Sequence, residues 1–334
     1  MTRPLLSALL CTYDRAPLLE RTLASLCEQT LPRDAFEVIL VDDGSRDHTG
    51  RVVEAYADRL PLVAARQANA GLASARNHAL YLARGELVLL VDDDDLAAPD
   101  LLERHVEAHA RWPDPMSAVL GYTGVSDELA ADPLMHFVTE IGRYLFSYPT
   151  LRAGTPLDFA HFWGGRSSAK RRTLIDHGVF NPVFRFGCED VELAYRLSRH
   201  GFHVLYEPRA VSTMVRGVDL DGFCRRLFRQ GESNLVFFGL HPTAEVRAWA
   251  EIDGAVAQWP SLAGRRELLQ VAARSLDVLF RRRAAAGVAS GAEDLALLHG
   301  AYHAAFRAAK LAGIASKAEA LHGPGWRQRL GAGR

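Results

Sequence analysis

The stretch LVLLVDDDD, residues 87–95, decides the fold that this sequence predicts. Its first five residues are continuously apolar, as expected of a strand that is buried on both faces of a sheet. Residues 5–11 and 36–41 form similar apolar runs, and residues 62–65 form a shorter one. Helix-like segments separate these runs, as they do in repeated βα units. The pattern therefore predicts an α/β fold whose Rossmann-like, mainly parallel sheet is flanked by helices.

Polar side chains follow three of the predicted strands. Residues 92–95 are four aspartates, Asp42 and Asp43 follow the second strand, and Tyr13 follows the first. Ligands bind beyond the carboxyl ends of the strands in such sheets. Adjacent carboxylates repel one another unless a cation neutralises them, and their hard oxygens suit Mg²⁺ or Mn²⁺ shared with substrate phosphates. The run predicts a metal site, and the alternative is a solvated loop in which Asp95 caps the next helix.

The composition is that of an ordinary globular protein, with 49% apolar and 24% charged residues, so the chain can bury a core. The formal net charge of −1 gives no basic surplus of the kind that a nucleic-acid partner requires. No apolar run approaches the roughly 20 residues of a membrane span. The four cysteines show no metal-binding spacing, which predicts free thiols in a reducing cytosol.

The strand and helix pattern becomes less regular beyond about residue 120, and from about residue 218 the chain has an all-helical pattern. This change predicts a sheet-containing domain, residues 1–215, followed by an all-helical C-terminal extension, residues 216–334. The elements expected in the irregular region are a loop-rich segment at 144–165, helices at 170–177 and 189–200, and a strand at 202–207.

Five sequence blocks stand in order along residues 5–215. They are residues 9–14, VDDGSRDHTG (41–50), NAGLASARNHAL (69–80), LVDDDDLAAPDLL (90–102) and GVFNPVFRFGCEDVELAYRLSRHGFHVLYEP (178–208). Together they resemble family 2 glycosyltransferases with the GT-A fold. The resemblance implies an inverting transfer of a sugar from a nucleotide-diphosphate donor to an acceptor hydroxyl, in polysaccharide, glycolipid or secondary-metabolite glycosylation. It also implies a nucleotide-binding half, residues 1–110, and an acceptor half, residues 111–215.

On the donor side, the resemblance implies contacts to the nucleotide base. Asp43, Tyr13 and Arg76 would contact the base, and Cys11 would line the same pocket through its backbone. The pattern of Asp43 and Arg76 fits uracil best, so a UDP-sugar is the expected donor, with deoxythymidine and guanosine donors as alternatives. Taken alone, Tyr13 offers a ring that could stack on a base, whereas Arg76 could equally be an exposed helix residue.

The resemblance also divides the aspartate run. Asp92 and Asp94 would be the two acids of the DxD motif, and Asp94 would ligate Mn²⁺ or Mg²⁺ most directly. Asp95 would face the sugar, and Asp93 would be a spacer. Arg166 stands where asparagine is frequent in the family, which would place a cation near the sugar or the diphosphate.

The acceptor side would carry the general base. Glu189 and Asp190 match the paired acids of the family, which makes Asp190 the expected base and Glu189 the reserve candidate. A carboxylate there could remove the hydroxyl proton as that oxygen attacks the anomeric carbon. Enrichment of acids in the first turn of a helix is the alternative explanation. Met214 stands where many relatives have a metal-binding histidine, so water or His241 would have to complete the site.

Other functions remain to be weighed. No glycine-rich loop follows the first strand, which disfavours a sugar-nucleotide-synthesising enzyme, and the absence of G-x-G-x-x-G disfavours a dinucleotide oxidoreductase. A catalytically degenerate sugar-nucleotide-binding or assembly protein remains as the alternative. The arginine-rich C-terminal helices could cover the core, form a homodimer or seat on an anionic membrane. We therefore expect a cytoplasmic protein, either free or peripheral to the inner face of the membrane.

Overall fold

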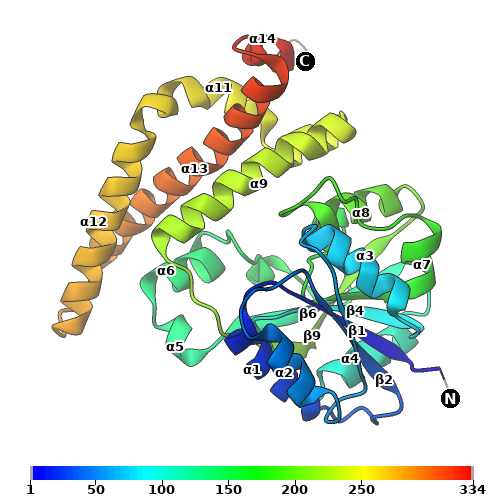
Figure 1. The fold of residues 1–334 in the computed structure, drawn as a ribbon. Helices are drawn as coiled ribbons and strands as arrows, with labels where there is room; N and C mark the ends of the chain where they lie inside the picture. The colour runs from blue at the N-terminus through cyan, green and yellow to red at the C-terminus, as the bar shows by residue number, and fades with distance from the viewer. Residues whose placement is uncertain (1–2, 332–334) are drawn as a thin grey trace. The chain divides into compact units, whose positions relative to one another are not determined.

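The computed structural model describes residues 3–331 and divides the chain into two compact units. The first unit contains the described residues up to Leu129 together with Tyr148–Arg216, and it holds the β-sheet. The second unit contains Ala130–Ser147 and the described residues from Gly217 onward, and it is helical (Figure 1).

The first unit is built on a mixed sheet. Its strands are β1 (Leu6–Thr12), β2 (Phe36–Asp42), β3 (Leu62–Arg66), β4 (Leu87–Asp92), β5 (Asp95–Ala97), β6 (Ser117–Val125), β7 (Pro156–Leu157), β8 (Ser167–Lys170) and β9 (His203–Met214). They lie in the order β3-β2-β1-β4-β8-β6-β9-β5, and β7 pairs with β9 off this path. The four predicted strands β1 to β4 pair in parallel, and so do β6 and β9. The predicted α/β fold with a parallel sheet at its centre is confirmed.

Helices accompany this sheet. They are α1 (Ala16–Cys27), α2 (Thr49–Tyr56), α3 (Leu72–Leu82), α4 (Leu101–Arg111), α5 (Asp127–Ala130), α7 (Arg171–Asp176) and α8 (Glu189–Ser198), with 3₁₀ turns at Tyr148–Thr150 and Phe159–His161. Strand side chains alternate between the two faces of the sheet. Leu6, Ala8 and Leu10 of β1 face a core that α1 and α2 complete, whereas α3 packs on β1 and β2 from the other face (Figure 1). Strands β1, β2 and β4 are therefore buried on both faces, as their apolar runs predict, whereas the edge strand β3 is largely exposed.

The structure differs from the sequence prediction in the irregular region. Strands β6 and β8 do not follow from the sequence pattern. The small and polar residues of β8 carry no strand signal, and the pairing of β8 with β4 and β6 decides its conformation. The predicted helix at 170–177 begins one residue later, since Lys170 ends β8. Strand β9 continues to Met214, well beyond the predicted end at 207, because β5 and the second half of β6 pair with it.

Ion pairs between Glu207 and two exposed arginines anchor β9 where its register with β6 shifts, between Gly121 and Tyr122. Glu207, which is buried, accepts hydrogen bonds from Arg209 Nε at 2.9 Å and from Arg111 Nη1 at 2.7 Å. The hydrogen bonds from Arg209, followed by that from Arg111, lower the pKa of Glu207 to about 2. The ionised carboxylate therefore ties α4 to β9.

We expect Glu207→Gln to lower the free energy of unfolding at pH 7 by about 2 kcal/mol, because charge-assisted hydrogen bonds are lost. The folded pKa lies below 4.5, the usual value of a glutamate, so this stabilisation is present above about pH 4.5 and is lost as the pH falls towards 2. Urea unfolding from pH 7 down to pH 3 should show the difference between variant and wild type shrinking. Glu107→Gln, which breaks an exposed pair with Arg104, is the control and should change little. A pH-independent loss would contradict this account.

The second unit is made of helices. They are α6 (Pro133–His136), α9 (Leu220–Leu240), α10 (Ala244–Trp249), α11 (Ile252–Leu262), α12 (Arg266–Ala285), α13 (Ala292–His322) and α14 (Trp326–Gly331), with a π-turn at Phe137–Ile141 and a 3₁₀ turn at Ala263–Arg265. Glycines let α9 and α13 approach closely: a Cβ on Gly313 would lie 1.9 Å from the carbonyl oxygen of Phe228. Across residues 3–331, none of these helices combines the length and the apolar character needed to cross a membrane.

The segment Ala130–Ser147 was predicted to belong to the sheet-containing domain, but it groups with the C-terminal helices. Its Phe137 ring packs on the rings of Tyr302 and Phe306 of α13, and Asp132 forms an ion pair with Arg281 of α12. These contacts join residues that lie more than a hundred positions apart, so local sequence periodicity could not indicate them.

Candidate active site

The parallel register aligns the carboxyl ends of β1, β2 and β4. Cys11 of β1 lies beside Val41 on one side and beside Asp92 on the other. Tyr13, Asp43 and Asp92 therefore gather at one edge of the sheet, as predicted from their places after the strands. Burial raises the pKa of the Cys11 thiol to about 12, so this side chain is a neutral thiol rather than a reactive thiolate.

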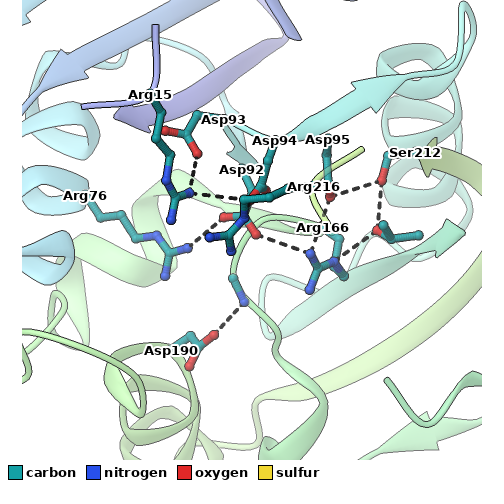
Figure 2. Close-up of polar contacts among 12 residues, drawn as sticks. Arg15, Arg76, Asp92, Asp93, Asp94, Asp95, Arg166, Asp190, Ser212 and Arg216 are labelled. Atoms are coloured by element: carbon teal, nitrogen blue, oxygen red, sulfur yellow. Dashed lines mark hydrogen bonds and ion pairs between the residues drawn. The ribbon is translucent and has the colours of Figure 1, made fainter. Parts of the chain in front are cut away.

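Four arginines from separate parts of the first unit surround the aspartate run, residues 92–95 (Figure 2). Each guanidinium forms an ion pair with at least one of the four carboxylates. Their charge offsets the mutual repulsion of the acids, which adds arginine side chains to the metal ion and the solvated loop that were expected for this run. The four are Arg15, Arg76, Arg166 and Arg216.

Asp93 and Asp94 face two of these arginines. Asp93 is buried and accepts hydrogen bonds from Thr12 Oγ1 and from Arg15 Nη1, both at 2.7 Å. Asp93 thus anchors the aspartate run to the end of β1, a contact that its expected role as a spacer did not include. Asp94 Oδ2 lies 3.4 Å from Arg15 Nη1 and 2.5 Å from Arg216 Nε.

Asp92 and Asp95 share Arg166. Its Nη2 atom lies 3.2 Å from Asp92 Oδ2 and 3.3 Å from Asp95 Oδ2, whereas its expected place near the donor sugar or the diphosphate stays a prediction. The Asp92 side chain is 31% exposed, whereas that of Asp95 is 1% exposed. Burial raises the pKa of Asp95 to about 7, against the opposing charge of Arg166. Since the Asp95 carboxylate lies in the interior, this conformation gives no support to its expected contact with the sugar.

Arg76 connects the aspartate run to the second acidic pair. It is 4% exposed, and its Nη1 donates to Glu189 Oε1 at 2.7 Å while its Nη2 lies 3.5 Å from Asp92 Oδ1. Arg76 therefore lies between the two acidic groups instead of presenting itself to a base. Burial and the neighbouring charge of Asp190 raise the pKa of Glu189 to about 7. Asp190 is only partly buried and accepts a hydrogen bond from the Gly164 backbone N–H at 2.6 Å.

Two glycines bring a loop against these charged groups. A Cβ on Gly165 would lie 2.0 Å from Asp92 Oδ2, and one on Gly164 would lie 2.3 Å from Arg76 Nη2. Gly165 also has a φ of 92°, which side-chain-bearing residues rarely adopt. Cys188, directly before Glu189, has a left-handed φ of 68°, the kind of backbone strain that concentrates at functional sites. The backbone of the loop at Gly164 and Gly165 therefore lies directly against Arg76 and Asp92.

Asp43 organises the loop that precedes α3. Its Oδ1 accepts from Gln67 Nε2 at 2.8 Å and from the Ala70 N–H at 2.9 Å, and its Oδ2 accepts from the Gly71 N–H at 2.9 Å. Oδ2 has one acceptor position left, which a base N–H could occupy. The Tyr13 ring is 42% exposed at the same edge and offers a flat face.

The carboxylates of Asp92 and Asp94 fit a divalent cation that is shared with a diphosphate, since Mg²⁺ is commonly held by one or two carboxylates plus substrate phosphates. No group of three potential metal-binding side chains occurs among residues 3–331. Met214, at the position expected for a ligand, is buried and pairs with Asp95 in the sheet. If Asp92 and Asp94 bind a cation, phosphate and water would have to supply its other ligands.

Three residues of this site were missed at the level of sequence. Arg15 stands three residues after the end of β1, and this proximity to a strand end was an available signal. Thr12 ends the strand itself and showed no distinguishing pattern. Arg216 lies two residues beyond β9, whose true end could not be predicted, so nothing marked it out.

Comparison with known proteins identifies a sequence family and relatives of this chain. The sequence profile described as Glycosyl transferase family 2 matches residues 7–174. Validoxylamine A glucosyltransferase of Streptomyces hygroscopicus subsp. jinggangensis (strain 5008) is 35% identical over 239 residues, which cover 65% of this chain and 55% of that protein. The second such enzyme, from subsp. limoneus, is 34% identical, with 65% and 51% covered. The chain thus spans about half the length of these curated relatives.

Solved structures also resemble the chain. The mannosyltransferase PcManGT from Pyrobaculum calidifontis, in complex with GDP-Man and Mn²⁺, is 25% identical with a TM-score of 0.63, covering 95% of this chain and 87% of that one. S. aureus TarS in complex with UDP has a TM-score of 0.52 at 18% identity, covering 93% and 90%, and shows the fold alone.

Proposed function

This chain belongs to glycosyl transferase family 2, and from that membership we propose that it transfers a sugar from a nucleotide-diphosphate donor to an acceptor hydroxyl. One observation carries the proposal. Arg76 is buried between two acidic groups, with Glu189 at 2.7 Å and Asp92 at 3.5 Å. One acidic group can hold a leaving diphosphate, and the other can activate a hydroxyl a short distance away.

We propose that the donor half comprises residues 1–110 and that its base lies against Tyr13, Asp43 and the Cys11 backbone. The free acceptor position on Asp43 suits the ring N–H of uracil, so a UDP-sugar is the proposed donor. The related mannosyltransferase structure contains GDP-Man, which makes guanosine the base to test against uracil. Arg76 is not part of this proposed base site, because its guanidinium forms ion pairs with Glu189 and Asp92.

We propose that Asp92 and Asp94 hold Mn²⁺ or Mg²⁺, which when bound would neutralise charge on the diphosphate. Arg15 and Arg216 lie on Asp94 and would add positive charge on the same side. The side chains of Arg15 and Arg216 are 36% and 37% exposed, so a turn from the carboxylate towards a phosphate is open to them.

In the acceptor half, residues 111–215, Asp190 is the proposed general base. Its carboxylate is partly exposed, whereas Glu189 is buried and bound to Arg76. Asp190 would take the proton of the acceptor hydroxyl as the new bond forms at the anomeric carbon. The bond to the diphosphate breaks in the same displacement, which inverts the anomeric configuration. Glu189 would hold Arg76 in place.

The experiment that tests this function is a donor panel. The protein is incubated with UDP-, dTDP- and GDP-sugars and Mn²⁺, and slow release of the nucleotide diphosphate is followed with and without EDTA. We expect release from one base class, with UDP favoured, and its suppression by EDTA. Nucleotide binding without release from any donor, even with pools of hydroxyl acceptors, would instead favour a degenerate sugar-nucleotide-binding protein.

We further propose that the second unit self-associates through the outer face of α12. Leu268, Val271, Val278 and Leu279 are between 42% and 68% exposed and lie on one side of this helix. Contiguous exposed apolar surface of this kind marks interaction sites. The face is self-complementary about Ser275: two antiparallel copies would place Val271 on Leu279, as an isologous interface requires.

Charge favours a second copy over a membrane, since the same antiparallel pairing sets Glu267 against Arg283. We expect Leu279→Glu to weaken self-association at least about tenfold, because it buries a carboxylate in an apolar contact. Sedimentation velocity would measure this, and Leu321→Glu, at an exposed site on α13, is the control. A wild-type protein that stays monomeric would overturn the proposal, and salt-sensitive binding to anionic liposomes would assign the face to a membrane.

A further inference from the structure

A small cavity lies behind the aspartate run, in the interior of the first unit. Its volume is about 10 Å³, and its lining includes Asp95, His105, Gly121, Arg166 and Ser212. Such a volume is about the minimum that admits one water molecule. Gly121 helps to keep this space open, because a Cβ there would lie 3.3 Å from His105 Nε2.

Two buried polar atoms of this lining lack a hydrogen-bond partner among the residues that the structure describes. They are Asp95 Oδ1 and His105 Nε2. The two residues are 1% and 0% exposed, so bulk water does not solvate them. Buried polar atoms in folded proteins are almost always hydrogen-bonded, so two unpartnered atoms on residues that line one cavity indicate a missing partner.

We propose that one water molecule is bound in this cavity and joins Asp95 Oδ1 to His105 Nε2, which makes His105 a positioning residue for the aspartate run. Ser212 and Arg166 line the same cavity and can supply further partners, so the water has the two to four contacts that a buried water requires. Nothing else assigned to the site so far accounts for either unpartnered atom.

A serine shared by two histidines decides the direction of the hydrogen bonds. Ser168 Oγ lies 2.8 Å from His105 Nδ1 and 2.9 Å from His109 Nε2. Burial lowers the pKa of His105 to about 3 and that of His109 to about 2, so both rings are neutral. The serine hydroxyl has one proton, so it donates to one ring and accepts from the other.

With the proposed water in place, one of the two arrangements leaves no buried N–H of these histidines without an acceptor. If Ser168 donates to His105 Nδ1, the proton of His105 is on Nε2 and points into the cavity, and His109 donates from Nε2. The reverse arrangement would leave the Nδ1–H of His109 buried, and that atom has no partner among the described residues. We therefore expect His105 Nε2–H to donate to the water, and the water to donate to the Asp95 carboxylate.

This connection has a consequence for the proposed donor site, and here the inference rests on the proposed function. Asp95 Oδ2 lies against Arg166 and Ser212, and the water would hold the other oxygen. A carboxylate bound on both oxygens keeps one rotamer, and it holds the Arg166 guanidinium against Asp92. These polar contacts therefore connect His105 of α4, through the water and Asp95, to Asp92, which is proposed to bind the metal.

The direct test is a crystal structure of the whole chain at a resolution that shows ordered water. One water within hydrogen-bonding distance of Asp95 Oδ1 and His105 Nε2 is the expected result. An empty cavity, or a direct bond between the two residues, would overturn the proposal. This test does not depend on activity, so it separates failure of the water site from failure of the proposed function.

The role of His105 is tested with two variants. His105→Leu should weaken binding of UDP with Mn²⁺ about tenfold, the lower end of effects seen for residues behind metal ligands. His105→Gln, whose amide can reach the position of Nε2, should recover affinity to within about threefold of wild type. Calorimetry gives the affinities, and thermal melting shows that each variant is folded.

His177→Leu, on a partly buried histidine that packs against His200 away from the cavity, is the matched control and should bind UDP as wild type does. Equal affinity of His105→Leu and wild type would overturn the positioning role. Should His105→Leu fail to fold, Ser168→Ala replaces it, since loss of the shared hydroxyl frees the His105 tautomer and should also weaken binding.

Discussion

Replacement of Asp94 with asparagine is expected to weaken Mn²⁺-dependent binding of the donor nucleotide about 100-fold, which corresponds to about 2.8 kcal/mol. The proposed metal site has two carboxylate ligands, Asp92 and Asp94, so loss of either charge would remove half of the ligands proposed for the protein. Asparagine keeps the size of the side chain, so packing around the buried residue changes little. Titration calorimetry with UDP in the presence of Mn²⁺ measures the effect.

The same titration in EDTA separates the metal from the arginines around it. Without a cation, Asp94→Asn should bind UDP as well as wild type or better, because Arg15 and Arg216 are released from the carboxylate. Asp100→Asn, which only loses a partly exposed pair with Arg104, is the control and should match wild type throughout. Undiminished affinity of Asp94→Asn with Mn²⁺ would show that this residue does not bind the metal.

Replacement of Asp190 with asparagine is expected to lower kcat by about 10²–10⁴-fold, the range that general base catalysis supplies. Donor affinity should stay within about threefold, since Asp190 contacts the Gly164 backbone and no residue of the aspartate run. The measurement is the rate of sugar transfer at saturating donor together with calorimetry of UDP binding.

The neighbouring acid provides the comparison. Glu189→Gln breaks the ion pair with Arg76, so it should weaken donor binding as well as turnover. This pattern differs from the one expected for Asp190, where turnover alone is lost. If Asp190→Asn kept wild-type turnover while Glu189→Gln lost it, the base would be Glu189, whose pKa of about 7 suits proton transfer near neutral pH.

Much of the fold could be predicted because its signals are local. The apolar runs of β1, β2 and β4 and the helical spacing of α1 depend on residues within a few positions of one another. Strands β6 and β8 could not be predicted in this way, since their conformation depends on pairing with β4 and β9. The same reason explains the segment Ala130–Ser147, whose aromatic side chains pack on a helix far along the chain.

In the candidate site, too, the positions of residues can be predicted from the sequence, whereas their contacts depend on the tertiary structure. The places of Tyr13, Asp43 and Asp92 at one edge follow from the rule that parallel strands align their carboxyl ends. The partners of these residues do not follow from it. Asp43 turned out to be held by the backbone of the loop before α3, and Arg76 by the two acidic groups.

By itself, the sequence determined the α/β fold, the edge of the sheet where the acids lie and the family of the chain, because repeating patterns and ordered motifs record these directly. Only the tertiary structure decided what neutralises the four aspartates. Residues 15, 76, 166 and 216 are far apart along the chain, and Coulombic attraction depends on distance in space. The aspartate run is thus surrounded by arginines, with Asp93 as an anchor and Asp95 turned to an inner cavity, and no local pattern encodes that arrangement.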